Sequence, residues 1–185
     1  MRIITGLYKG RRLSTVPDLS VRPATERVRQ TLFNMLENRI AFDGITVLDL
    51  FAGSGSLGFE ALSRGARRVV FVERDEDALH HLEVNATALG CLDDVEILAM
   101  DALQFITMTS DRFALVFADP PYAFPDTAAI PQELFSRNII SDDGYLLIEH
   151  SSVLHFSDTA LYAAGPEKKF GRTCVTFFQS RREQQ

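Results

Sequence analysis

Apolar runs alternate with amphipathic stretches along most of this chain. Four apolar runs have the length and composition of buried strands, at residues 45–51, 68–73, 95–100 and 113–119. Stretches with helical spacing follow the first three runs, at residues 56–64, 75–89 and 102–106. Continuous apolar strands that alternate with helices predict a parallel, doubly wound sheet with both faces covered, an α/β fold.

The beginning of the chain departs from this alternation. The segment around residues 2–16 alternates in polarity and contains Gly6 and Gly10, which predicts a small hairpin. Residues 22–40 carry a single apolar stripe at helical spacing and predict a helix. We therefore expect one domain over residues 1–185, with residues 1–41 as an N-terminal extension and residues 42–185 as the core.

The end of the chain predicts a helix and three more strands. The helical stretch covers residues 131–139 and precedes a fifth strand at residues 145–151. Two final strands are expected at residues 160–171 and 173–180.

Acidic side chains stand at the ends of the first four expected strands. In parallel sheets, ligands bind at the carboxyl ends of the strands, so acids on successive strands converge on one edge. A single such acid would more often be a turn or helix-capping residue. Here the acids form a set: Asp49, Glu73, Asp101 and Asp119.

A glycine-rich turn lies between the first expected strand and its helix. Gly53, Gly55 and Gly58 have the Gly-x-Gly-x-x-Gly spacing, which lets the chain turn sharply and lets a ligand approach the backbone. Glu73 follows at the end of the second strand, where a carboxylate can accept hydrogen bonds from both ribose hydroxyls. This combination predicts a nucleoside site and fits a nicotinamide dinucleotide equally well.

Two acids favour a different ligand. Asp49 lies just before the glycine turn, where it would repel a diphosphate but attract a sulfonium and an ammonium group. Asp101 and Ala102 follow the third strand and are placed to hold the exocyclic amine of an adenine. The set suits S-adenosylmethionine better than a dinucleotide.

The fourth strand ends in a stiff peptide, Asp119-Pro120-Pro121-Tyr122. Proline fixes its own backbone angle and restricts the residue before it. Alone, this motif is equally consistent with a strand terminator and an aromatic plug. On the same edge as a nucleoside site, it predicts fixed hydrogen-bond acceptors and a stacking ring for a target base.

Composition indicates a protein without a membrane helix, and the distribution of charge indicates the kind of partner that it binds. No apolar run reaches the roughly 20 residues that a membrane helix needs, the N-terminus lacks a signal-peptide core, and we expect a cytoplasmic protein. The two cysteines, Cys91 and Cys174, are expected to be free. Residues 1–39 carry eight basic and three acidic side chains, and residues 167–185 carry five basic and two acidic ones. Because the net charge of the whole chain is −6, these basic ends flank an acidic body and hint at a polyanion partner.

The motifs together resemble a known family. The segments LDLFAGSGSLGFEALSRGA, FVERD, DALQF and FADPPY resemble the class I S-adenosylmethionine-dependent methyltransferases. The terminal segments MRIITGLYKGRRL, RPATERVRQTLFNML and KKFGRT sharpen this to the RsmD family, bacterial methyltransferases that act on guanine N2 in 16S ribosomal RNA. The one small departure is Ala24, where the family usually has threonine.

The resemblance implies a Rossmann-like, seven-stranded sheet whose last strand is antiparallel, with the FGRT turn between the last two strands. It implies S-adenosylmethionine as cofactor and, as partner, 16S ribosomal RNA in the small subunit or its assembly intermediate. We expect a monomer, because no apolar surface stripe is left over. The implied catalytic residues are Asp119, Pro120, Pro121 and Tyr122. The implied cofactor residues are Asp49, Phe51, Ala52, Gly53, Ser54, Gly55, Gly58, Glu73, Arg74, Asp101, Ala102 and Thr25.

Basic residues near both ends are candidates for RNA phosphate contacts. An ordinary solvated helix face is the plainer interpretation of those in residues 22–40. The candidates are Lys9, Arg11, Arg12, Arg22, Arg27, Arg29, Lys168, Lys169 and Arg172. The four histidines show no ligand spacing, and we expect no metal site.

Three other functions stay open at this point. An adenine-N6 methyltransferase on DNA or RNA also carries Asp-Pro-Pro-Tyr, although a DNA enzyme usually needs a separate recognition domain. A nicotinamide-dependent oxidoreductase would leave the Asp-Pro-Pro-Tyr motif unexplained. A non-catalytic RNA-binding protein would not need a complete cofactor edge.

Overall fold

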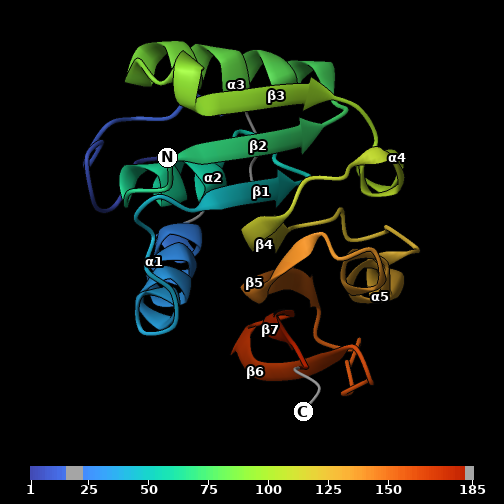
Figure 1. Cartoon of the computed structure of the whole chain (residues 1–185). Coiled ribbons are helices and arrows are strands. Elements are labelled where there is room, and N and C mark those ends of the chain that lie inside the picture. Colours follow the sequence, from blue (N-terminus) through green and yellow to red (C-terminus); the bar gives the residue numbers. More distant parts are fainter. Residues whose placement is uncertain (16–22, 182–185) are drawn as a thin grey trace.

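The computed structural model describes residues 1–15 and 23–181, and in the first helix it describes side chains from residue 26 onward (Figure 1). The described chain forms a seven-stranded sheet in the order β3-β2-β1-β4-β5-β7-β6. Its strands are β1 (Thr46–Leu50), β2 (Arg68–Glu73), β3 (Val95–Ala99), β4 (Phe113–Ala118), β5 (Ile140–Ser151), β6 (Tyr162–Phe170) and β7 (Thr173–Ser180). Strands β1 to β5 pair in parallel, and β7 runs antiparallel to both β5 and β6. The expected sheet and its antiparallel last strand are confirmed.

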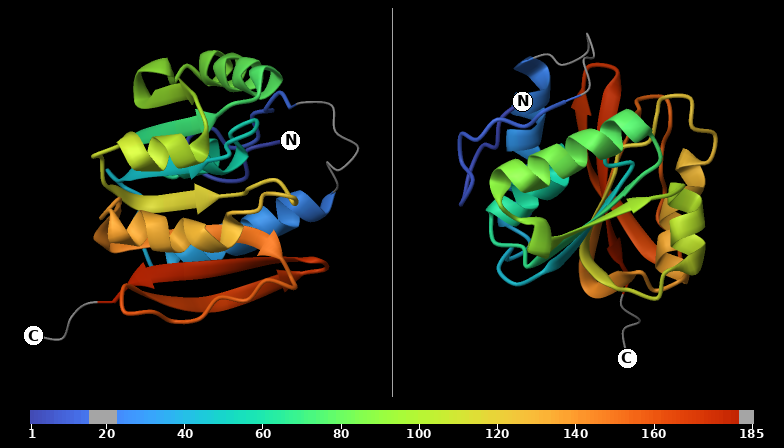
Figure 2. Two further views of the ribbon diagram at one scale, coloured as in Figure 1. Left: turned by 90° about the vertical axis from the view of Figure 1, so that its right-hand side faces the viewer. Right: turned by 90° about the horizontal axis from the view of Figure 1, so that it is seen from above.

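Five helices cover the described part of this sheet. They are α1 (Pro23–Glu37), α2 (Ser56–Ser63), α3 (Glu76–Leu89), α4 (Ala102–Met108) and α5 (Ile130–Ser136). Seen from above, the sheet separates α1, α2 and α3 from α4 and α5 (Figure 2). Each face therefore has its own apolar core, one around Phe33, Phe59 and Phe71, the other around Phe113 and Phe178.

Local sequence sets the ends of the helices. In α3, the Asp75 side chain accepts a hydrogen bond from the amide of Ala78 at 2.9 Å and so caps the first turn. Gly90 ends the same helix at φ 73°, a left-handed conformation that glycine adopts without strain. These signals explain why the expected helix at residues 75–89 agrees with the structure.

The N-terminal segment is less regular than a hairpin. One antiparallel bridge joins Arg2 to Arg12, and the amide of Leu13 donates to the carbonyl of Met1 at 2.9 Å. The segment has few apolar side chains to bury, and packing of Ile3 and Leu13 into the core holds it in place. In Figure 2, this segment, α1 and the tip of the β6–β7 hairpin lie toward the same end of the molecule.

Two remaining expectations concern cysteine chemistry and membranes. Cys91 and Cys174 are free and buried, as predicted. Within residues 1–15 and 23–181, no helix is both long enough and apolar enough to cross a bilayer.

Candidate active site

A deep cleft opens at the carboxyl ends of the strands. It has a volume of about 1360 Å³ and lies between α1, the ends of β1 to β5, and the β6–β7 hairpin. A smaller cavity of about 210 Å³ adjoins it beside the loop that follows β4. The residues that line both spaces are Asp119, Pro120, Pro121, Tyr122, Glu149 and Thr173. The stiff motif therefore stands where the two spaces meet.

The three glycines of the turn have different functions in the structure. A Cβ atom on Gly55 would lie 2.6 Å from Leu82, and one on Gly58 would lie 2.3 Å from the Phe71 ring. A Cβ atom on Gly53 would meet nothing within 4 Å, although its φ is +55°. Gly55 and Gly58 are therefore required for packing, whereas the backbone at Gly53 is open to a ligand.

Asp49 lies beneath this turn. Only 2% of its surface is exposed, and its Oδ2 accepts a hydrogen bond from the amide of Gly58 at 2.9 Å. Burial raises the pKa of Asp49 well above its usual value, and the nearby charges of Asp119 and Glu73 raise it further. A cationic ligand at this edge would relieve that repulsion.

Glu73 holds the turn from the end of β2. Its Oε2 accepts from the amide of Gly53 at 2.8 Å, and its Oε1 accepts from the amides of Arg74 and Asp75 at 2.7 and 2.9 Å. A carboxylate offers about four acceptor positions, so three of them are already used. An acceptor position remains free for the ribose, so the contact of Glu73 with the ribose hydroxyls stays a prediction.

Asp101 caps helix α4. Its Oδ1 accepts from the amides of Leu103 and Gln104, and its Oδ2 lies 3.3 Å from Nη1 of Arg74. The capping function that a single acid would suggest is therefore real. Asp101 and Ala102 also line the large cleft, so a contact with an adenine amine stays a prediction.

The Asp-Pro-Pro-Tyr loop rests against the glycine turn. The amide of Phe124 donates to the carbonyl of Pro121 at 2.8 Å and closes a tight turn. The Phe124 ring meets the Phe51 ring edge-on, with centroids 5.0 Å apart. Phe51 has φ 59°, which is rare for a residue with a side chain and marks a backbone held under constraint. Phe51 thus joins the two motifs that the sequence singled out.

Tyr122 presents its ring to solvent at the mouth of the cleft. The residue is 76% exposed, and its hydroxyl lies 2.5 Å from the Thr173 hydroxyl at the start of β7. One hydrogen bond therefore ties the exposed ring to the β6–β7 hairpin, which leaves its faces available for stacking.

Sequence reasoning missed a fifth acid on this edge, Glu149. The last register pair of β4 and β5 is Ala118 with Ile148, so Asp119 and Glu149 follow it on neighbouring strands. Asp119 is open to the cleft on one side. Protein atoms surround it on the other sides and remove much of its water, and this burial raises its pKa to about 6. Burial, followed by the charge of Asp119, raises the pKa of Glu149 to about 8. The strand-end rule that found the other four acids, applied to residues 145–151, would have found Glu149.

Comparison with known proteins identifies the chain. The family model described as conserved hypothetical protein 95 matches residues 1–179. Ribosomal RNA small subunit methyltransferase D of Haemophilus influenzae is 42% identical over 152 residues, which cover 80% of this chain and 78% of that protein. This chain belongs to the RsmD family.

Solved structures share the fold of this chain. The yhhF protein of Escherichia coli is 31% identical, with a TM-score of 0.86 over 99% of each chain. A SAM-dependent methyltransferase from Agrobacterium tumefaciens is 18% identical, with a TM-score of 0.65, and covers 92% of this chain and 66% of its own. The latter likeness shows only that the fold is shared.

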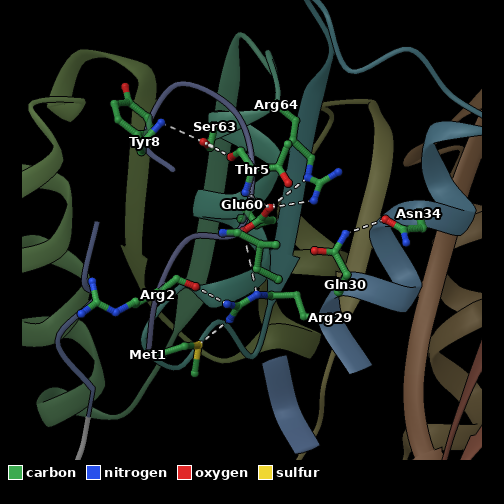
Figure 3. A network of polar contacts seen from close by, with 12 residues as sticks. Met1, Arg2, Thr5, Tyr8, Arg29, Gln30, Asn34, Glu60, Ser63 and Arg64 are labelled. Carbon is green, nitrogen blue, oxygen red and sulfur yellow. Dashed lines mark hydrogen bonds and ion pairs between the residues drawn. The ribbon is translucent and has the colours of Figure 1, made fainter. Parts of the chain in front are cut away.

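In this RsmD-family chain, a buried carboxylate fastens the N-terminal segment to helix α2 (Figure 3). Glu60 is fully buried, accepts from the amides of Ile4 at 2.7 Å and Thr5 at 3.1 Å, and pairs with Arg64 at 2.8 Å. Arg29 of α1 lies 3.9 Å from the same carboxylate. The helix that begins at the glycine turn therefore also holds the N-terminal segment.

Arg29 requires a correction. It was expected to meet RNA phosphates, but only 4% of its surface is exposed. Its guanidinium donates to the carbonyl of Arg2 and contacts the sulfur of Met1 (Figure 3). Because its charge is directed inward to Glu60, we reassign Arg29 to positioning the N-terminal segment. The apolar stripe of residues 22–40 gave no sign that Arg29 is buried, because Arg29 does not belong to that stripe.

A second buried residue joins the N-terminal segment to the glycine turn. The Asn85 side chain of α3 donates to the carbonyls of Ser54 at 3.0 Å and Ser14 at 2.9 Å. Its oxygen accepts from the amide of Ser14 at 2.7 Å. No periodic or motif signal marked this residue, because its importance depends on two loops that meet only in the fold.

The other predicted basic residues divide into two groups. Arg27, Lys169 and Arg172 line the large cleft. Lys9, Arg11, Arg12 and Lys168 are exposed outside the described lining, and Arg11 donates to the carbonyl of Ala88. Arg22 and the side chain of Thr25 lie outside the described residues.

Proposed function

We propose that this chain transfers a methyl group from S-adenosylmethionine to the exocyclic N2 of a guanine in 16S ribosomal RNA. The observation that carries the proposal is the position of Asp119, in a rigid loop where a large cleft and a smaller cavity meet. A donor in one space and a base in the other would meet at this carboxylate. The printed name of the relatives, ribosomal RNA small subunit methyltransferase D, supports the choice of RNA.

The residues present suit a cationic cofactor. Asp49, Glu73 and Asp119 lie close enough that the charges of the last two raise the pKa of the first. A sulfonium and an ammonium group would be attracted to such an edge, whereas a diphosphate would be repelled. When bound, S-adenosylmethionine supplies an activated methyl group. Gly53 would let its amino-acid portion approach the backbone, Glu73 would accept from the ribose, and Asp101 with Ala102 would border the adenine.

Asp119 would act on the base. The N2 lone pair of guanine is delocalised into the ring, so the amine is a poor nucleophile. Hydrogen bonds from N2 to the Asp119 carboxylate and to the Pro120 carbonyl would favour tetrahedral geometry and stabilise the positive charge that develops. Because prolines fix these acceptors, little reorganisation is needed, and alignment supplies further rate.

Tyr122 would hold the base after it leaves its stack in the RNA. Its ring is exposed at the edge of both spaces. Stacking of a base on an aromatic ring stabilises binding by about 1–3 kcal/mol. The tether to Thr173 would keep the ring in place for an extruded nucleotide.

RNA would enter along the basic rim of the cleft. Arg27 of α1 and Lys169 and Arg172 of the hairpin are exposed residues in its lining. Lys9, Arg12 and Lys168 would extend the phosphate contacts beyond it. Affinity that rests on such contacts falls steeply with salt.

We infer that residues 1–41 are an extension of a single methyltransferase domain, because Glu60 and Asn85 of the core hold the segment at residues 4–14. The substrate would be the small subunit or its assembly intermediate, in the cytoplasm. We also propose a monomer, because few large apolar side chains of the described residues are exposed: Leu7, Val84, Leu92, Met108, Tyr122 and Val153.

A methyl-transfer assay tests the proposal. Small subunits from a strain that lacks this gene would be incubated with the purified protein and methyl-labelled S-adenosylmethionine, then digested to nucleosides. We expect label in N2-methylguanosine with the unaltered protein and none with Asp119→Ala, while both bind S-adenosylmethionine in calorimetry. Label in N6-methyladenosine, or full activity of Asp119→Ala, would contradict the proposal.

A further inference from the structure

Glu149 lies beside Asp119 at the carboxyl edge of the sheet. It follows Ile148 on β5, as Asp119 follows Ala118 on β4, and the two strands pair in register at that point. Adjacent strands lie about 4.8 Å apart, and residues in register point to the same face of a sheet. The two carboxyl groups therefore stand side by side.

The face on which they stand is the wall of the cleft. Side chains alternate along a strand, so Leu147 and Glu149 of β5 share one face. Val175 lies opposite Glu149 on β7, and both line the large cleft together with Asp119. Asp119 and Glu149 also line the smaller cavity, whose walls include Phe124 and Leu154. A cavity with apolar walls and two adjacent acids suits a flat ring that has hydrogen-bond donors along one edge.

Among the residues that the structure describes, none pairs with the carboxyl group of Glu149. Its side chain makes neither a hydrogen bond nor an ion pair with any residue in the part of the chain that the structure describes. The group is half-buried, and its pKa is raised to about 8 by burial first and then by Asp119. When both acids are ionised they repel each other, so the ionised pair costs stability unless a ligand that donates to both of them bridges it.

We propose that the target guanine enters the smaller cavity and that Glu149 accepts a hydrogen bond from its N1–H while Asp119 holds its N2 amine. This inference rests on the proposed function and assigns the choice of base to a particular residue. Guanine carries the N1–H and N2–H donors next to each other on one edge, which matches two adjacent acceptors. Adenine carries an acceptor, N1, beside its amine and would face Glu149 with a lone pair.

Glu149 can accept the hydrogen bond from guanine N1–H in both of its protonation states. A carboxyl group keeps an acceptor oxygen whether or not it is protonated, so N1–H is satisfied in both states. A base whose N1 carries a lone pair needs a donor, which Glu149 provides only when it is protonated. The discrimination is therefore strongest above the pKa of Glu149, where the acid is ionised.

2-Aminopurine tests the proposal, because it keeps the 2-amino group of guanine but has a bare N1. Reconstituted small subunits would carry guanine or 2-aminopurine at the methylated position, and transfer would be measured at pH 8.5. The unaltered protein should prefer guanine by at least about 100-fold, as a site built for an N–H rejects an analogue that lacks it. Glu149→Gln, whose amide can donate to a bare N1, should bring the two rates within about tenfold of each other.

The control is Glu83→Gln, the same chemical change at an exposed position on α3, which should keep the original preference. Thermal unfolding and S-adenosylmethionine affinity would show that Glu149→Gln is folded. An unchanged preference in the folded Glu149→Gln variant would overturn the inference. Loss of transfer to both bases would also overturn it, because Glu149 would then serve the chemistry itself. If the unaltered protein does not methylate guanine, the proposed function fails instead.

Discussion

The hydroxyl of Tyr122 lies 2.5 Å from the hydroxyl of Thr173, so one hydrogen bond joins the loop after β4 to the first residue of β7. This contact sets the exposed ring against the hairpin whose tip carries Arg172. The Asp-Pro-Pro-Tyr loop and the basic rim of the cleft are thereby parts of one surface.

Two variants of Tyr122 separate the ring from its tether. Tyr122→Phe keeps the stacking face and loses only the hydrogen bond to Thr173, so we expect the KM for the small subunit to rise about threefold to tenfold, the value of a modest hydrogen bond. Tyr122→Ala also loses stacking, which is worth about 1–3 kcal/mol, and its KM should be about fivefold to 150-fold higher than that of the phenylalanine variant. Steady-state kinetics of methyl transfer measure both. Equal activity of the two variants would show that the ring does not stack on the base.

Two glycines of the cofactor turn should respond differently to alanine. Gly58→Ala places a methyl group 2.3 Å from the Phe71 ring and should lower the free energy of unfolding by about 1–3 kcal/mol. Gly53→Ala meets open space, carries only the strain of its positive φ, and should mainly weaken S-adenosylmethionine binding. Urea unfolding and calorimetric titration of both variants make the comparison. The interpretation fails if Gly53→Ala is the less stable of the two and binds the cofactor normally.

The buried Glu60 should be essential for the N-terminal segment. Glu60→Gln would leave Arg29 without its counter-charge and Arg64 with only Glu37 as its partner, and loss of one partner of a buried pair costs about 3–5 kcal/mol. We expect a lower free energy of unfolding and faster proteolysis between residues 1 and 15. Glu133→Gln, which alters an exposed pair with Arg137 on α5, is the matched control and should change stability by about 1 kcal/mol or less. Equal effects of the two substitutions would contradict the importance of the buried site.

The pair Asp119 and Glu149 should make folding stability depend on pH. Burial raises the pKa of Glu149 from 4.5 to about 8, so the folded protein holds this proton more tightly than the unfolded chain does. The resulting stability is fully present below pH 4.5 and is lost as pH rises through about 8; Asp119, with a pKa of about 6, acts in the same direction. Urea unfolding should show a falling free energy between pH 5 and pH 8.5, and a smaller fall in Glu149→Gln. An identical pH dependence in that variant would contradict the assignment.

The sequence predicted those parts of the site that depend on short-range patterns. Strand ends, the Gly53 turn and the rigid loop from Asp119 to Tyr122 follow from residue type and spacing along the chain. Those patterns also predicted that Glu73 and Asp101 would reach the same edge, since the ends of parallel strands meet there. The cleft lining contains both of them.

Other parts of the site were not predicted, because they depend on contacts between segments that are distant in the sequence. Arg29 was assigned to RNA because a charged residue off an apolar stripe normally faces solvent, and the buried Glu60 that attracts it lies on another helix. Asn85 bonds two loops whose meeting no local pattern encodes. Glu149 was within reach of the strand-end rule, because it lies near the end of the expected strand at residues 145–151, but it belongs to no short motif.

The central claim is that this chain methylates guanine N2 in small-subunit ribosomal RNA. The most direct measurement is nucleoside mass spectrometry of 16S ribosomal RNA from a strain in which the gene is deleted, with the parent strain and a strain complemented by Asp119→Ala. We predict loss of N2-methylguanosine at one site in the deletion strain, and no recovery with Asp119→Ala. An unchanged profile of modified nucleosides after deletion would contradict the account.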